Sequence, residues 1–124
     1  MEYGQFGGTD LARIIQETVP GKQITMAHVI SSPNPLIYQK LGLDPTVDYN
    51  KAAIGVMTIT PSETAIIAAD IAMKRAQIDI GFIDRFSGTL IVTGKIADVS
   101  TAWEAVLMYA KQKMGFSVCE ITKA

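Results

Sequence analysis

The sequence predicts a single α+β domain, in which helices pack on one mostly antiparallel sheet. Three observations lead to this prediction. Short β-branched segments with alternating apolar residues recur along the chain. Two longer segments carry apolar residues at helical spacing, and between them lie two strands that a five-residue loop can join as a hairpin. With 124 residues, the chain can form one core but not two.

The composition suggests that part of the surface is covered in an assembly. Apolar residues form 48% of the chain and charged residues only 19%, whereas an average soluble domain has ~25% charged residues. A domain of this size exposes much surface and has few charges to place on it. We therefore expect other subunits to cover some of its apolar surface.

Charge and hydropathy exclude several classes of partner. The net charge is −1 and no basic run occurs, which argues against nucleic-acid binding. The apolar stretches Ala65–Met73 and Ala102–Ala110 are too short to span a bilayer, so no membrane association is expected. The first residues lack the pattern of a secretory leader. The single Cys119 allows no disulfide within the chain and fits a reducing compartment, so we expect a cytoplasmic protein.

The N-terminal third is predicted to contain a tail and two strands. Residues 1–12 are expected to form a flexible tail because glycines and polar residues dominate them. The domain proper then covers residues 13–124. The segment Arg13–Val19, closed by Pro20 and Gly21, predicts a short strand. In the next strand, Gln23–Ile30, alternation places four side chains on one face: Ile24, Met26, His28 and Ile30.

A short helix and a loop are expected next. The helix covers Leu36–Leu41 and ends at Gly42. The following segment, Asp44–Asn50, has the composition of a surface loop.

The next elements alternate between strand and helix. Ala53–Thr60 is predicted to be a strand. The sequence Thr60-Pro61-Ser62-Glu63 has the capping-box pattern T-x-x-E, which predicts a helix that begins there and extends to about Ala76. Two further strands, Ile78–Ile83 and Thr89–Gly94, are expected to form a hairpin with the loop Asp84–Gly88.

The C-terminal part is predicted to be a helix and a strand. Asp98 is expected to cap a long helix with apolar residues at helical spacing, and Gly115 is expected just beyond its end. Phe116–Ile121 is then predicted to be the final strand.

No combination of residues predicts catalysis, so the chain is not expected to be an enzyme. His28 is the only histidine, and the sequence indicates no acid or base that would orient it for proton transfer. We therefore expect it to pack at a subunit contact. Cys119 has no CxxC partner and is expected to be half-buried. Asp84 and Arg85 are expected to be solvated or to pair with a neighbouring subunit. Lys74 alone is typical of a solvated cation near a helix C-terminus.

No metal or cofactor is expected either. The chain has no zinc or iron–sulfur ligand spacing and no phosphate-binding glycine motif. A ring of Cys119 side chains that symmetry would bring together is the one metal arrangement that stays open.

Three segments resemble a known family: Pro20–His28, Ala53–Glu63 and Ile80–Gly88. In that order they are similar to the circularly permuted bacterial microcompartment (BMC) shell proteins of the EutS/PduU type. The likeness extends over roughly residues 13 to 123. It implies a self-assembling structural protein, a cyclic hexamer that tiles into the microcompartment shell in the cytoplasm and encloses an enzyme set. Ethanolamine, propanediol and choline utilization are all compatible pathways.

The resemblance also assigns positions in the hexamer. It implies that Gln23–Leu41 is the permuted strand and helix, and that Ala53–Ala76 is the first strand and helix of the ordinary domain. Lys74 matches a lysine at the edge between hexamers. The hairpin loop matches the segment around the six-fold axis: Asp84, Arg85, Phe86, Ser87 and Gly88. The N-terminal strand would form a small β-barrel over the axis: Arg13, Ile14, Ile15, Gln16, Glu17, Thr18 and Val19. Closing a ring would pair the edges of this strand.

Two other functions stay open at this stage. One is a ligand-binding or regulatory α+β module, with His28, Asp84 and Arg85 as its polar groups. The other is a shell component that docks cargo through the barrel mouth or the residues Met1–Asp10. The expected partners are copies of the chain, other shell proteins and, as candidates, encapsulated enzymes.

Overall fold

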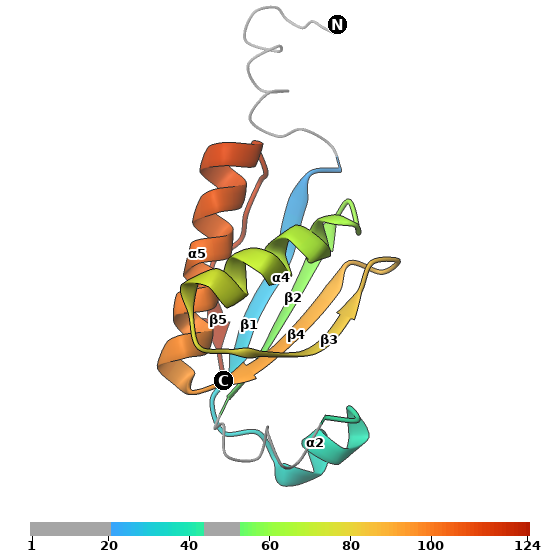
Figure 1. Cartoon of the computed structure of the whole chain (residues 1–124), viewed down its shortest axis with the longest axis vertical. Helices are drawn as coiled ribbons and strands as arrows, with labels where there is room; N and C mark the ends of the chain where they lie inside the picture. The colour runs from blue at the N-terminus through green and yellow to red at the C-terminus, as the bar shows by residue number, and fades with distance from the viewer. Residues whose placement is uncertain (1–20, 44–52) are drawn as a thin grey trace, which may run out of the picture.

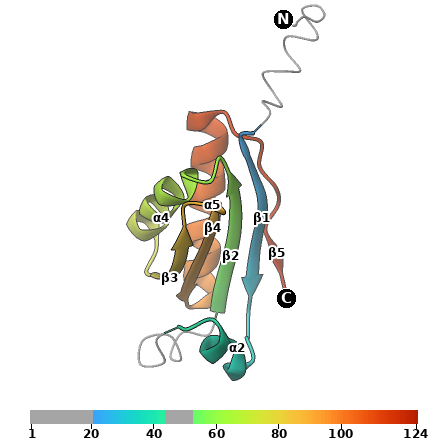
Figure 2. The same ribbon diagram turned by 90° about the vertical axis from the view of Figure 1, so that its right-hand side faces the viewer.

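The computed structural model describes residues 21–43 and 53–124, and in them two long helices lie on one face of a five-stranded sheet (Figures 1 and 2). The order of elements is β1 (Gln23–Ile30), α2 (Pro35–Lys40), β2 (Ala53–Thr60), α4 (Thr64–Arg75), β3 (Asp79–Asp84), β4 (Thr89–Gly94), α5 (Ile96–Met114) and β5 (Thr122–Lys123). The predicted strand Arg13–Val19 and the predicted loop Asp44–Asn50 lie outside these residues.

The sheet has the strand order β3-β4-β2-β1-β5. The pairs β1–β2, β2–β4 and β3–β4 are antiparallel, and only β5 runs parallel to its neighbour β1. The prediction of an α+β domain with a mostly antiparallel sheet is therefore confirmed. β1 lies inside the sheet although it precedes the other four strands of the described residues in the sequence.

The core lies between the sheet and the helices α4 and α5. Trp103 of α5 is fully buried, and its indole Nε1 donates a hydrogen bond of 3.1 Å to the carbonyl oxygen of His28. Gly55 of β2 lies directly beneath it, because a Cβ there would come within 2.9 Å of the indole. On α4 the buried residues are mostly alanines, which let this helix lie close to the sheet. The small α2 covers part of the other face, where Tyr38 packs with Ile54 and Ile91.

The predicted faces of β1 are confirmed from Met26 to Ile30 but are wrong at Ile24, because the strand contains an irregularity. The pairing with β2 shifts between Ile24 and Met26, so the alternation reverses at this point. Ile24 consequently shares the core face with Ala27 and Val29, all at most 3% exposed, whereas Met26 is 40% exposed.

The predicted capping box at Thr60–Glu63 is also wrong. Thr60 is the last residue of β2 and pairs with Gln23, whereas α4 begins only at Thr64 with Glu63 at its N-cap position, so Thr60 lies too far from the helix to cap it. Pro61 begins a turn in which its carbonyl accepts the Thr64 amide at 3.0 Å, and α4 starts at Thr64 with no side-chain cap.

α5 also begins earlier than predicted, at Ile96 rather than after a cap at Asp98. Asp98 instead lies in the first turn, where its negative charge favours the helix dipole. Its end is as predicted, with Gly115 in the left-handed conformation at φ 72°.

The predicted strand Phe116–Ile121 does not form. Phe116 turns into the core, with its amide bonded to the Ala110 carbonyl at 3.0 Å, and Ser117 makes a single bridge with Gln23. Regular pairing follows only over the two residues of β5. We call residues 116–123, which include β5, the C-terminal segment.

The contact between Gly55 and Trp103 gives a first prediction. Gly55→Ala should destabilise the domain by roughly 1–3 kcal/mol, because the added methyl would overlap Val99 and the indole within the packed core. Gly81→Ala is the matched control. Its methyl would overlap only the flexible end of Leu43 and would lie at ordinary contact distance from Ile91, so the loss should be smaller. Thermal or urea unfolding measures both, and an equal loss would contradict the proposed constraint at Gly55.

Candidate assembly site

The described residues hold no grouping that suits catalysis. Among residues 21–43 and 53–124, no cluster of three or more His, Cys, Asp or Glu side chains could hold a metal ion. No helix in this part of the chain is long and apolar enough to cross a bilayer. The polar residues of the ligand-binding alternative lie apart. His28 and Asp84 are on β1 and β3, which are three strand spacings or about 14 Å apart across the sheet.

His28 and Cys119 each occupy a structural position. The half-buried His28 has its Nδ1 at 2.6 Å from the hydroxyl oxygen of Thr122, which ties β5 to β1. Burial raises the pKa of the Cys119 thiol, so this cysteine is a weak nucleophile at neutral pH. The sequence-based prediction of a half-buried cysteine is confirmed.

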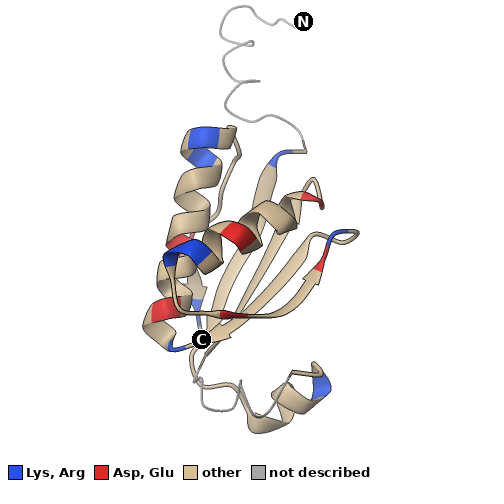
Figure 3. Ribbon diagram, viewed as in Figure 1, with Lys and Arg blue, Asp and Glu red and all other residues tan. Residues whose placement is uncertain are grey.

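Large apolar side chains are exposed on several elements, as the composition predicts. Charged residues are sparse over the sheet and lie mainly on the helices and at strand ends (Figure 3). In the described part of the chain, large apolar side chains at least 39% exposed lie on β1, on or next to every helix, and in the β3–β4 hairpin: Met26, Leu36, Ile37, Leu41, Ile66, Ile67, Met73, Phe82, Ile83, Phe86, Ile96, Met108 and Tyr109. Exposed apolar groups in such number indicate surfaces that are covered in an assembly.

The hairpin loop Asp84–Gly88 is held rigidly by its own hydrogen bonds. The Asp84 carboxylate accepts the Phe86 amide and the Ser87 hydroxyl, both at 2.9 Å. Gly88 is confined because it has φ 78° and a Cβ there would lie 2.0 Å from the Ile59 carbonyl oxygen. Its own carbonyl accepts the Ile59 amide at 2.8 Å, which anchors the loop to the end of β2.

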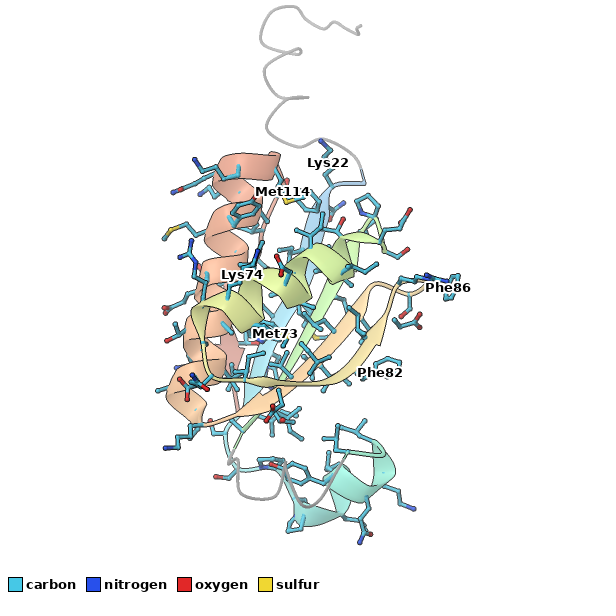
Figure 4. The ribbon with its side chains drawn as sticks, in the orientation of Figure 1. Lys22, Met73, Lys74, Phe82, Phe86 and Met114 are labelled. Atoms are coloured by element: carbon cyan, nitrogen blue, oxygen red, sulfur yellow. The ribbon has the colours of Figure 1, made fainter. Side chains whose placement is uncertain are left out.

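This loop presents one aromatic side chain to the outside. Phe86 is 82% exposed, and the Arg85 guanidinium lies 5.1 Å from the centre of its ring. Figure 4 shows Phe86 at the tip of the hairpin, pointing away from the body of the domain. Ile66 of α4 and Ile83 line a shallow hollow beside it with a volume of about 300 Å³.

Lys74 lies away from the hairpin, near the C-terminal end of α4 (Figure 4). Its Nζ is 2.8 Å from Asp70, and the hydrogen bond and charge of that carboxylate raise the pKa of the lysine. Both side chains are more than half exposed, so this ion pair contributes little to stability.

A groove lies between α5 and the C-terminal segment, and we call it the α5 groove. It has a volume of about 490 Å³. Its walls are largely apolar, with Leu107 and Met108 on the helix and Val118 and Ile121 opposite. The prediction of a regular strand over 116–121 hid this feature. The signal was present in Leu107 and Met108, which follow the buried Val106 and extend the apolar surface of α5 beyond its core face.

The structure thus brings together the predicted loop residues Asp84 to Gly88 and separates them from Lys74. The predicted barrel residues Arg13–Val19 lie outside the described part of the chain.

Comparison with known proteins gives a consistent result. The family profile of the BMC domain matches residues 53–122. The chain is 54% identical to the bacterial microcompartment shell protein CutR of Streptococcus intermedius, over 90% of this chain and 92% of that protein. It is 47% identical to the shell protein PduU of Salmonella typhimurium over 90% and 92%, and 44% identical to the shell protein EutS of Escherichia coli over 93% and 99%. The solved structure of a CutR flat hexamer superposes with a TM-score of 0.78 over 90% of this chain and 99% of that one.

The hydrogen bonds of Asp84 predict a pH dependence of the hairpin loop. They lower the pKa of the Asp84 carboxyl in the folded protein. The contribution of this carboxylate to the stability of the loop is therefore complete above its pKa in the unfolded chain, about 4, and is lost as the pH falls through its lower pKa in the folded protein. Protection of the Phe86 amide from hydrogen exchange, corrected for intrinsic rates, should therefore fall in acid. Asp84→Asn keeps an acceptor for that amide but does not titrate, so its protection should not change over the same range. Identical profiles for the two proteins would contradict this role.

Proposed function

The chain belongs to the BMC domain family, and from this premise we propose that it is a circularly permuted shell tile that forms a hexamer closed over its axis by its own N-terminal residues. It is a structural subunit of a bacterial microcompartment shell and not an enzyme. The observation that carries the hexamer proposal is the likeness to the CutR flat hexamer over nearly the whole chain at 54% identity. The exposed apolar side chains give this tile surfaces to bury against its copies.

The position of β1 supports the circular permutation. The match to the BMC domain begins at Ala53, the first residue of β2, so β1 and α2 precede it. Nevertheless β1 lies between β2 and β5 and is hydrogen-bonded along its length to β2. A strand that completes the sheet from the front of the chain is what a permuted order of elements requires.

The hairpin loop and the start of β1 lie at the same end of the sheet. Gln23 pairs with Thr60, and the neighbouring Ile59 is bonded to Gly88 of the loop. The chain therefore enters the described domain, at Gly21, close to the loop that the family resemblance assigns to the six-fold axis. This proximity supports the proposal that Arg13–Val19 forms the barrel over that axis and that residues 1–12 are a tail beyond it.

α4 supports the assignment of Lys74 to the outer edge. The helix begins near the hairpin loop and its 12 residues span about 18 Å. Lys74, near its far end, is thus directed away from the proposed axis (Figures 1 and 4). We propose that it contacts the neighbouring hexamer, and that the tile contributes shape and closure to the shell rather than passage for metabolites.

The first test of this proposal is the size and shape of the particle. Light scattering of the full chain should give the mass of a hexamer, and electron microscopy should show a ring with density over its axis. Removal of residues 1–20 should leave the ring intact but open its centre. A monomer at high concentration would contradict the hexamer, whereas a truncated ring that stays closed would contradict only the barrel.

The edge contact is tested by Lys74→Ala. This variant should remain hexameric but should lose extended sheets or tubes in electron micrographs, because the contact between hexamers is removed. Two variants serve as controls and should assemble normally. Lys95→Ala removes an exposed lysine at the start of α5, and Asp70→Asn removes the ion-pair partner of Lys74 but leaves the charge of Lys74 in place. Unchanged assembly in Lys74→Ala would contradict the assignment.

A further inference from the structure

A ring of identical subunits needs two different surfaces that fit each other, because each subunit contacts one neighbour with each side. Two features of this chain lie on opposite sides of the domain. The exposed hairpin loop is at one side, and α5 with the C-terminal segment is at the other (Figures 1 and 4). One feature projects and the other is hollow.

The projecting feature is Phe86 together with Arg85. An aromatic side chain that is 82% exposed gains much from burial, since such a residue can bury 150–250 Å². The hydrogen bonds of Asp84 fix the loop before any contact forms, which lowers the entropy that association costs. Arg85 brings a positive charge next to the ring.

The hollow feature is the α5 groove. A cavity of about 150 Å³ can hold benzene, so the groove of about 490 Å³ has room for a phenylalanine ring and part of an arginine. Leu107, Met108, Val118 and Ile121 offer it apolar contacts. The groove also includes two exposed acids, Glu104 and Glu120, and one base, Lys111, which leaves a net negative charge.

Both features extend to the same end of the domain. Ser117, next to Val118 of the groove, donates its amide to the Lys22 carbonyl at 3.0 Å. Lys22 precedes Gln23, which lies at the end where the loop is anchored. Near a rotation axis the opposite sides of adjacent subunits come closest together, so a loop and a groove at this end can meet.

We propose that Phe86 of each protomer inserts into the α5 groove of the next protomer, where Arg85 faces Glu104 and Glu120. This inference rests on the proposed ring and specifies its contact between subunits. The occupant is a second copy of the chain, because the charge of Arg85 complements that of the groove and the two features are placed as a closed ring demands.

The native cysteine provides a direct test, because Cys119 lines the α5 groove and is the only cysteine in the chain. In Phe86→Cys, oxidation at mildly alkaline pH or a short bismaleimide should link position 86 of one protomer to Cys119 of the next. A head-to-tail contact yields a ladder of covalent species up to the hexamer on a non-reducing gel. Lys95→Cys is the matched control and should give no ladder.

Phe86→Cys combined with Cys119→Ser separates this arrangement from its alternatives. The ladder should disappear in the double variant. Dimers that persist there would mean that the hairpin loops meet one another at the axis, which would overturn the proposal. A folded, hexameric Phe86→Cys protein that fails to crosslink would also overturn it, while leaving the shell function in place. If the unaltered chain is not hexameric, the ring itself is overturned.

Charge reversal gives an independent readout in the full chain. Arg85→Glu should raise the protomer concentration at which the ring half-dissociates by roughly tenfold, because like charges would then face each other. Glu120→Arg in the same chain should restore much of the loss, whereas Glu63→Arg, an exposed acid outside the groove, should not. If Glu120→Arg and Glu63→Arg had equal effects on the Arg85→Glu protein, the proposed pairing of Arg85 with the groove would be overturned. Native mass spectrometry or sedimentation measures the dissociation.

Discussion

The packing of α5 on the sheet through Trp103 is the contact on which the rest of the structure depends. The indole lies on Gly55 of β2 and is hydrogen-bonded to the backbone of β1, so it fixes the helix against two central strands at once. A side chain at position 55 would move the helix outward. Because α5 is held this closely, α4 can pack beside it through alanines, and both helices occupy a single face of the sheet. The remaining surfaces are left for contacts with other molecules.

Those remaining surfaces explain the unusual composition. In a chain of 124 residues, an ordinary monomer would cover its surface with charges, yet this chain has only 19% charged residues and exposes Phe86, Met73 and Met108. Each of these three residues lies on a different element, so the exposed apolar surface is spread over several sides of the domain. A protein that meets neighbours all around its rim requires this distribution, and a protein with one binding cleft does not.

The elements with strong local signals could be predicted from the sequence. Short apolar, β-branched segments predicted β2 and β4, and helical spacing predicted the body of α5, while Gly115 predicted its end. The errors arose where pairing between distant residues overrides local preference. Thr60 has the right residue type for a helix cap, but it ends β2 in pairing with Gln23, and a turn separates it from α4. The irregularity after Ile24 likewise depends on how β1 meets β2, and no local pattern reveals it. Of the site, the family resemblance could nominate the hairpin loop, whereas the α5 groove depends on the tertiary course of the C-terminal segment.

The irregular course of that segment is what creates the groove. A regular strand over 116–121 would lie along β1 at the normal spacing and alternate its side chains, which would extend the sheet beneath α5 and close the space between them. Instead its backbone bridges β1 at Ser117 and pairs with β1 again at β5, and no regular ladder forms between these points. Val118 and Ile121 then face α5 across a gap that the domain itself does not fill. This segment has the β-branched residues that are typical of a strand, but most of its backbone does not pair with β1. Such a conflict between local preference and structure is expected where a surface serves a contact outside the fold.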